Sequence, residues 1–307
     1  MIVSMGECLI DFTPFEENGR LVGFRLYPAG SPCNVAVGMG RLGYAAGFAG
    51  RLSRDFFGKI LAEHLDSSDV DTTLLQTGDE PSPLAFVALD QDEPVYSFRI
   101  EGTAATQIRP EELQIDRFLR LEALHFGSIS LLFEPSASSI LALVRKLKGR
   151  VTLSFDPNLR PNLVTEWEPY RARLRECVAL ADLIKVSGAD LEVWGESDPR
   201  EWLADNGPVA VVVTRGPEGS RLYYQGGELE CPAVPCRLVD TVGAGDAYTS
   251  GLLVSLAERH ALSRAGMTEL EPERWLEVMH FASTVAALTC EKPGADPPWR
   301  REVVARL

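Results

Sequence analysis

The segment 240–251 places Gly243, Gly245 and two carboxylates at the start of an expected helix, in the order Asp-Thr-Val-Gly-Ala-Gly-Asp-Ala-Tyr-Thr-Ser-Gly. Gly243 and Gly245 let the backbone turn so that successive N–H groups face one point, where the helix dipole adds positive charge. Such a turn binds phosphate, and Asp246 would lie beside the bound group. An Asp that only caps the helix is the alternative. That role would not require Gly-Ala-Gly before it or Asp240 six residues earlier. A P-loop is excluded because no Lys-Ser or Lys-Thr follows the glycines, and a dinucleotide fingerprint because G-x-G-x-x-G is missing.

Four more polar residues follow expected strands or open expected helices, where α/β sheets bind ligands. Asp11 ends the first apolar run and can accept hydrogen bonds from ligand hydroxyls, with turn capping as its alternative. Asn34 offers a donor and an acceptor to a polar ligand, and it can also cap its helix. Asn158 and Arg160 follow a central strand. The planar guanidinium suits a phosphate or a sugar oxygen, and a surface ion pair is its alternative.

Composition excludes several classes of protein. The chain has 307 residues with 44 acidic and 30 basic side chains, a net charge of −14, and no basic run, so nucleic acid and anionic membranes are not expected partners. No apolar run reaches the ~18 residues of a membrane span. The first residues lack the basic start of a signal peptide, and the six cysteines form no Cys-x-x-Cys pair. We therefore expect a cytoplasmic protein.

Short apolar runs rich in β-branched residues alternate with longer helical patterns, which predicts βαβ units. The expected strands are 2–10, 45–49, 123–127, 151–155, 183–186 and 209–214. The expected helices are 32–42, 55–65, 135–148, 167–181, 198–205, 245–257 and 272–289. This order predicts one α/β domain over residues 1–307, with three α/β/α layers around a mainly parallel sheet.

Two stretches depart from this rhythm, because 20–28 and 83–100 alternate apolar and polar residues. Such alternation is typical of strands with one face in water. We expect insertions at about 12–30 and 83–105 to form a small β-lid that closes over the carboxyl ends of the parallel strands. A further hairpin, 220–225 with 228–232, has Gly-Gly at its turn.

Three segments resemble motifs of the ribokinase-like (PfkB) carbohydrate kinases, and the resemblance covers the whole chain. The stretch 240–251 resembles the C-terminal signature of that family. Residues 29–36 (Ala-Gly-Ser-Pro-Cys-Asn-Val-Ala) resemble its Gly-Gly-x-x-x-Asn-x-Ala sugar-binding segment, with Ala29 in place of the first glycine. Residues 155–161 resemble its Asp-x-Asn-x-Arg element. The resemblance implies a ribokinase-like fold.

It also implies a role for each matching residue. The expected base is Asp246, and the expected anion hole consists of the backbone N–H groups of Gly243, Ala244 and Gly245. The expected sugar-binding residues are Asp11, Gly30, Asn34, Phe98, Arg99 and Arg160. The expected ATP-binding residues are Asn158, Ser187, Asp190, Thr214, Gly216 and Gly219.

The metal sites rest on weaker matches. The Asn-x-x-Glu motif of the family reads Ser187-x-x-Asp190 here, and Asp190 keeps a carboxylate that could hold Mg²⁺ through water. Ser187 as a helix cap is the alternative. Asp240 and the loop 292–296 resemble a monovalent-cation site, which would take K⁺. The turn 213–219 resembles a segment beside the nucleotide, although a tight turn before a hairpin would look similar.

The resemblance implies an ATP- and Mg²⁺-dependent kinase that phosphorylates a primary hydroxyl of a small sugar. Gly6-Glu7, the segment 125–128 and the segment 293–298 look most like fructokinases, which favours conversion of D-fructose to fructose 6-phosphate. Arg99-Ile100 and Ala105 depart from the fructokinase pattern. 2-Keto-3-deoxygluconate kinase, nucleoside kinase and a non-catalytic sugar-sensing paralogue stay open as alternatives. The expected partners are the sugar and ATP, and a homodimer is left open.

Overall fold

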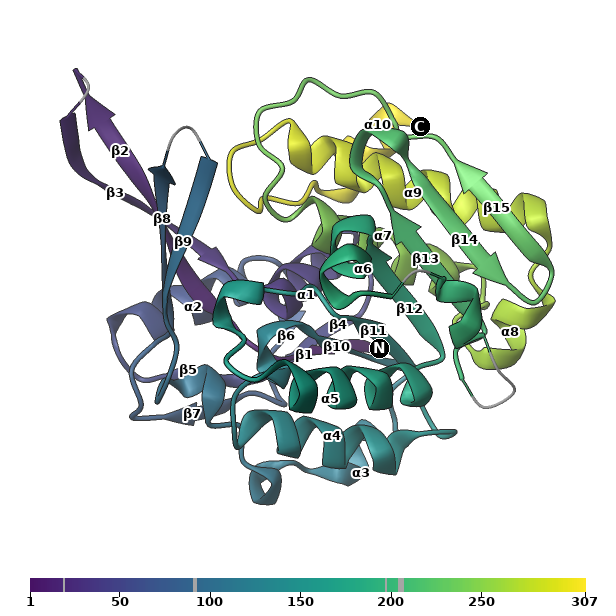
Figure 1. Ribbon diagram of the computed structural model, residues 1–307, viewed down its shortest axis with the longest axis horizontal. Coiled ribbons are helices and arrows are strands. Elements are labelled where there is room, and N and C mark those ends of the chain that lie inside the picture. Colours follow the sequence, from purple (N-terminus) through teal and green to yellow (C-terminus); the bar gives the residue numbers. More distant parts are fainter. Residues whose placement is uncertain (19, 91–92, 197, 204–206) are drawn as a thin grey trace.

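The computed structural model describes residues 1–307 apart from 19, 91–92, 197 and 204–206 (Figure 1). Across this described part of the chain, a nine-stranded sheet forms the centre of the molecule. Its strands, in spatial order, are β15 (Gly227–Cys231), β14 (Ser220–Tyr224), β13 (Ala210–Thr214), β12 (Leu183–Ser187), β11 (Thr152–Asp156), β10 (Ala123–Gly127), β1 (Ile2–Met5), β4 (Ala46–Ala49) and β6 (Val70–Asp71). The strands from β13 to β6 are parallel, and β14 and β15 add an antiparallel hairpin.

Helices cover both faces of this sheet (Figure 1). One face packs against α1 (Ser31–Arg41), α7 (Ala244–Glu258) and α9 (Pro272–Cys290), and the other against α4 (Ser136–Leu147), α5 (Trp167–Leu180) and α6 (Gly188–Trp194). Successive strand residues point to opposite faces, so Val212 lies in the first core while Val211 and Val213 lie in the second. The three-layer α/β/α arrangement predicted from the sequence is confirmed.

Shorter elements complete the fold. They are α2 (Phe56–Asp66), α3 (Ile115–Phe118), α8 (Arg264–Glu269), α10 (Arg300–Arg306) and the parallel pair β5 (Arg51–Ser53) and β7 (Gln76–Gly78). None of the helices within the described ranges combines the length and apolar character needed to cross a membrane.

A second sheet, which includes the segments expected to form a lid and is called the lid below, projects from one side of the body (Figure 1). Its spatial order is β3 (Arg20–Ala29), β2 (Leu9–Glu17), β8 (Leu84–Asp90) and β9 (Glu93–Arg99). β2 pairs antiparallel with β3 and parallel with β8, so two segments that are distant in sequence build one sheet. The lid begins at residue 9, slightly earlier than the insertion predicted at about 12.

Two predicted elements differ from the structure. The expected strand 2–10 is two strands, because the chain turns at Gly6 and leaves the central sheet for the lid. Gly6 has a φ of 153°, and a Cβ there would lie 2.5 Å from Pro32 Cγ and from Ser130 Oγ. The expected helix 198–205 is a short 3-10 helix at Pro199–Trp202, and part of the predicted range lies outside the described residues.

Candidate active site

The segment 240–251 begins helix α7, as predicted, and Gly243 is its N-cap with a φ of 75°. A Cβ on Gly243 would lie 2.6 Å from Ala295 Cβ, so both backbone shape and space require glycine there. Gly245 lies inside the helix without a positive φ, and the expectation that both glycines shape the turn is wrong for it. It is small for another reason, because a Cβ there would lie 2.8 Å from Lys185 Nζ.

The backbone donors at this helix end are unequal. The Ala244 N–H donates to Thr241 O at 3.2 Å, so it is already engaged within the turn. Within the described residues, the N–H groups of Gly243 and Gly245 have no such acceptor, as is usual for the first turn of a helix. Two of the three expected anion-hole donors are therefore free to face a phosphate.

The Asp246 carboxylate is 7% exposed and is held by the start of α1. Ser31 Oγ donates to Asp246 Oδ1 at 2.6 Å, and Asn34 Nδ2 donates to Asp246 Oδ2 at 2.8 Å. Burial raises the pKa of Asp246, while these two hydrogen bonds and the Lys185 ammonium act in the opposite direction. The structure thus joins Asp246 to Asn34, two residues from separate motifs, and adds Ser31, which the sequence reasoning did not single out.

Gly30 fixes the approach of α1 to this site. It is the N-cap of α1 with a φ of 109°, and a Cβ there would lie 2.7 Å from Glu7 O. Pro32 follows in the first helical turn. Gly30 therefore lets the α1 N-terminus pack against the turn between β1 and β2, which brings Asn34 to Asp246.

Asp11 lies half-buried in β2, and no side chain among the described residues donates a hydrogen bond to its carboxylate. Burial raises the pKa of Asp11 to about 6, Arg160 opposes this shift, and Asp246 adds to it. Arg160 Nη1 donates to Asn158 Oδ1 at 2.7 Å and to Leu159 O at 2.9 Å. The structure therefore brings Asp11, Arg160 and Asp246 into one electrostatic environment.

The two lid residues lie on β9, where Phe98 is in register with Ala85 and Ala85 in turn with Asp11. Phe98 packs into the cluster formed by Leu9, Ala29 and Ile100 at the base of the lid. Arg99 is exposed, and its Nη1 donates to Ser97 Oγ at 3.1 Å and to Phe98 O at 3.0 Å. Arg99 is thus bound to its own strand in this structure and is not among the residues that surround Asp11.

Ser187 and Asp190 form a capping box at the start of α6, which was the alternative reading of Ser187. Ser187 Oγ donates to Asp190 Oδ2 at 2.6 Å, and the Asp190 N–H donates back to Ser187 Oγ at 3.0 Å. Asp190 Oδ1 accepts from the Leu159 N–H at 2.8 Å. Asp190 therefore ties the end of β12 to the loop that carries Asn158 and Arg160.

A buried ion pair below this loop was missed by the sequence reasoning. Lys185 Nζ lies 2.9 Å from Asp156 Oδ2, with side chains 5% and 1% exposed. Asp156 Oδ1 accepts from the N–H of Asn158, which has a φ of 38°. The sequence contains one indication of this pair, because a lysine within a short apolar strand is rarely buried unless it is paired.

Thr214, Gly216 and Gly219 lie at and beyond the end of β13. Thr214 is in register with Ser187 on the adjacent strand β12, so these polar residues share one edge of the sheet. Gly219 has a φ of 88°, and a Cβ there would lie 2.2 Å from Cys231 O, so hairpin packing requires glycine. Gly216 is exposed with a φ of 54°.

Asp240 joins the two loops that the sequence comparison paired. Its Oδ1 accepts from the Val242 N–H at 3.0 Å, and its Oδ2 accepts from the Gly294 N–H at 2.8 Å. The described residues contain no cluster of three or more His, Cys, Asp or Glu side chains that would hold a metal ion alone. Asp190 offers one carboxylate at the end of β12, and Mg²⁺ usually takes one or two carboxylates from a protein and completes its shell with phosphates and water.

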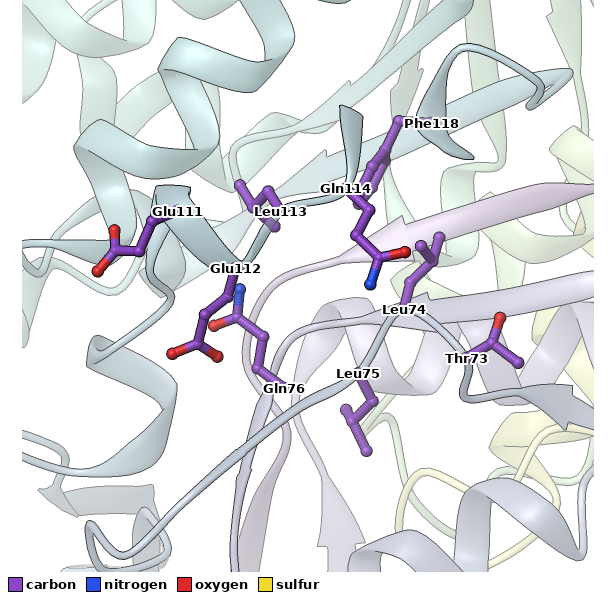
Figure 2. A pocket seen from close by; sticks show the side chains of 9 residues that line it. All are labelled: Thr73, Leu74, Leu75, Gln76, Glu111, Glu112, Leu113, Gln114 and Phe118. Atoms are coloured by element: carbon purple, nitrogen blue, oxygen red, sulfur yellow. The ribbon is translucent and has the colours of Figure 1, made fainter. Parts of the chain in front are cut away.

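A cavity of about 390 Å³ lies elsewhere, beside the 110–118 segment (Figure 2). It is lined by Thr73, Leu74, Leu75, Gln76, Glu111, Glu112, Leu113, Gln114 and Phe118. None of these is a predicted site residue, and the cavity offers two carboxylates where an ATP site requires groups that attract phosphate. The candidate active site is instead the region where Asp246, Asn34, Asp11 and Arg160 meet.

Comparison with known proteins decides the family. The model of the pfkB family carbohydrate kinases matches residues 1–301. The chain belongs to this family. It is an ATP-dependent sugar kinase, as the motifs predicted, and its fold is ribokinase-like.

Individual relatives agree with this assignment. A fructokinase from Rhizobium leguminosarum bv. trifolii is 34% identical over 277 residues, which cover 89% of this kinase and 85% of that protein. A fructokinase from Xylella fastidiosa with bound ATP has a TM-score of 0.89 and 28% identity, covering 99% and 97% of the two chains. A double mutant of the Vibrio cholerae O395 fructokinase, with fructose, ADP and potassium ion bound, has a TM-score of 0.86 and 28% identity, covering 100% and 97%.

Proposed function

We propose that this kinase transfers the γ-phosphoryl group of ATP to the primary 6-hydroxyl of D-fructose, giving fructose 6-phosphate, with Asp246 as the general base. The observation that carries the proposal is the buried Asp246 carboxylate at the N-terminus of α7, held by Ser31 and Asn34. The fructokinases among its relatives support the choice of sugar.

Each step of the transfer has a group in this site. Asp246 takes the proton of the sugar hydroxyl while the oxygen of that hydroxyl forms a bond to the γ-phosphorus. The bond from that phosphorus to the bridging oxygen breaks, and its electrons leave with ADP. The N–H groups of Gly243 and Gly245 face the transferred group and stabilise its charge. Ala244 joins them only if its N–H leaves Thr241 O when the nucleotide binds.

The sugar side is built from groups that suit a neutral polyol. Asp11 accepts from sugar hydroxyls, Asn34 and the backbone at Gly30 line the same side, and Arg160 provides a planar donor. In this proposal residues 1–307 act as one domain. The lid, insertions 12–30 and 83–105, closes over the sugar and excludes water, with Phe98 and Arg99 moving inward as it closes.

The nucleotide lies along the ends of β11 to β13 in this proposal. Its expected contacts are Asn158, Ser187, Asp190, Thr214, Gly216 and Gly219. Mg²⁺, when bound, would neutralise phosphate charge, and Asp190 would hold it through water because both of its oxygens already accept hydrogen bonds. Asp240 and the 292–296 loop would hold K⁺, and the potassium ion in the Vibrio cholerae relative supports this.

One observation favours a second substrate. Arg160 acts electrostatically on Asp11, so a sugar acid could enter without facing an uncompensated carboxylate. 2-Keto-3-deoxygluconate is therefore the second candidate.

A turnover screen tests the substrate. The purified kinase is assayed with ATP, Mg²⁺ and K⁺ on fructose, glucose, ribose, 2-keto-3-deoxygluconate and adenosine, and the phosphorylated position is read by ³¹P and ¹³C NMR. We expect the highest kcat/KM for D-fructose and phosphate on its 6-hydroxyl. A kcat/KM for 2-keto-3-deoxygluconate about tenfold above that for fructose would make the sugar acid the substrate in place of fructose. If none of these compounds is phosphorylated, the proposed function is overturned.

A further inference from the structure

Lys185 is a buried cation whose hydrogen-bonding capacity is only partly used. It lies within β12 between two buried apolar residues and is 4% exposed. An ammonium group has three donors. In the described part of the chain one acceptor is found for it, Asp156 Oδ2 at 2.9 Å. The other two donors are unused, which is unusual for a charge removed from water.

The position of this ammonium relates it to the proposed base. A Cβ on Gly245 would lie 2.8 Å from Lys185 Nζ, so the charge lies directly against the first turn of α7. Gly245 immediately precedes Asp246. The ammonium is thus fixed from below by Asp156 and meets the helix at the residue before the base.

Three other carboxyl groups interact electrostatically with Asp246. They are Glu7 in the turn between β1 and β2, Asp11 in β2 and Asp156 at the end of β11. Asp190, from α6, acts on Lys185. α1 offers only the neutral donors Ser31 and Asn34.

Two cations oppose these carboxylates, and they act at different places. Arg160 acts on Asp11 and donates to Asn158. Lys185 acts on Asp246 itself and lowers its pKa by more than Asp156 raises it.

We propose that Lys185, held by Asp156 beneath the first turn of α7, is a positioning residue that supplies the fixed positive charge keeping the Asp246 carboxylate ionised for catalysis. This inference rests on the proposed role of Asp246 as the base. Lys185 does not touch the sugar. It acts through Asp246, and its removal should therefore change the pH at which the kinase works.

The test is the pH profile of kcat/KM for D-fructose, from pH 5 to 9.5, in wild type and Lys185→Met. An opposite charge within about 4–6 Å lowers a carboxyl pKa by roughly 1–3 units. In Lys185→Met we expect the acidic limb of the profile to lie about one pH unit above that of the wild type. Most of the lost activity should return at high pH. Arg51→Met is the matched control, because Arg51 is also buried and paired, with Glu80 and Glu112, and is not among the groups that act on the pKa of Asp246. It should lower Tm without moving the acidic limb.

Lys185→Met leaves Asp156 buried without its partner and can lose stability for that reason alone. The double variant Lys185→Met/Asp156→Asn removes both charges and keeps an oxygen at position 156 to accept from Asn158. We expect its Tm to recover while a smaller upward shift of the acidic limb remains. An unshifted limb in the double variant, or a deficit equal at every pH, would overturn the inference. If Asp246→Asn is inactive and the acidic limb of the Lys185 variants is unshifted, the inference about Lys185 fails and the proposed role of Asp246 stands. An active Asp246→Asn would instead remove the proposed base.

Discussion

Gly245→Ala probes how closely α7 packs on the buried ion pair. The new Cβ would lie 2.8 Å from Lys185 Nζ, whereas ordinary contact begins near 3.4 Å, so the ammonium must retreat by about 0.6 Å. That movement displaces the ammonium from its position in the 2.9 Å hydrogen bond with Asp156. Losing a hydrogen bond between charged groups costs about 1.5–3 kcal/mol. Alanine in a helix is favoured over glycine by about 1 kcal/mol, which offsets part of this.

We therefore expect Gly245→Ala to lower the free energy of unfolding by about 1 kcal/mol and Tm by about 2 °C. Because Gly245 also carries an N–H group of the proposed anion hole, kcat should fall about tenfold, less than the roughly 100-fold that a 1 Å misplacement of reacting groups can cost. The assays are thermal unfolding and steady-state turnover of fructose.

Gly188→Ala is the matched control. Gly188 also begins a helix, but its Cβ would meet no atom closer than 3.8 Å. That variant should keep its Tm and retain kcat within about twofold. Wild-type kcat and Tm in Gly245→Ala would refute the packing argument and the placement of the anion hole together.

Three further predictions follow from the buried carboxylates. Asp11→Asn should raise the KM for fructose by at least about tenfold and leave the KM for ATP within about twofold, whereas the exposed control Asp79→Asn should change neither. Equal changes in both KM values would show that Asp11 does not serve the sugar. In the wild type, kcat/KM should fall as pH drops below about 6, because the pKa of Asp11 is about 6 and that of Asp246 is raised, so both carboxylates take up protons. A flat profile down to pH 5 would contradict this. Burial raises the pKa of Glu7 from 4.5 to about 7, so its stabilising contribution is present below pH 4.5 and is lost as pH rises through 7. Glu7→Gln should therefore raise Tm at pH 8, by a gain of up to about 3 kcal/mol, and have little effect at pH 5. An equal change at both pH values would indicate that Glu7 is not the titrating group.

Much of the fold could be predicted because the periodicity of apolar residues indicates where the strands and helices lie. The strand 123–127 and the long helices near 167–181 and 272–289 were found within a residue or two, since continuous apolar runs and helical spacing are strong local signals. The break at Gly6 was missed because apolar runs lie on both sides of Gly6-Glu7, and only the contacts that a Cβ on Gly6 would make with Pro32 and Ser130 show why the chain must turn.

The residues of the site also fall into two groups, those with local sequence signals and those whose partners are distant in sequence. Asp246, Asn34 and Gly243 belong to motifs with local glycine signals, and the structure brings them together. Ser31 and Lys185 were missed because their partners, Asp246 and Asp156, are distant in sequence. Ser187 illustrates the opposite problem. Its pattern matched a ligand-binding motif, and the capping box that it forms could be distinguished only from side-chain geometry.

The central claim is that Asp246 is the base of a fructose kinase, and it is tested most directly by turnover of D-fructose with saturating ATP and Mg²⁺ in wild type and Asp246→Asn. The amide keeps the size of the side chain and can still bond to Ser31 and Asn34, but it cannot accept the proton. ATP binding is followed by calorimetry and folding by Tm. We predict that kcat falls about 100-fold or more while ATP binding and Tm stay close to wild type. Retention of more than about a third of wild-type kcat would contradict the account.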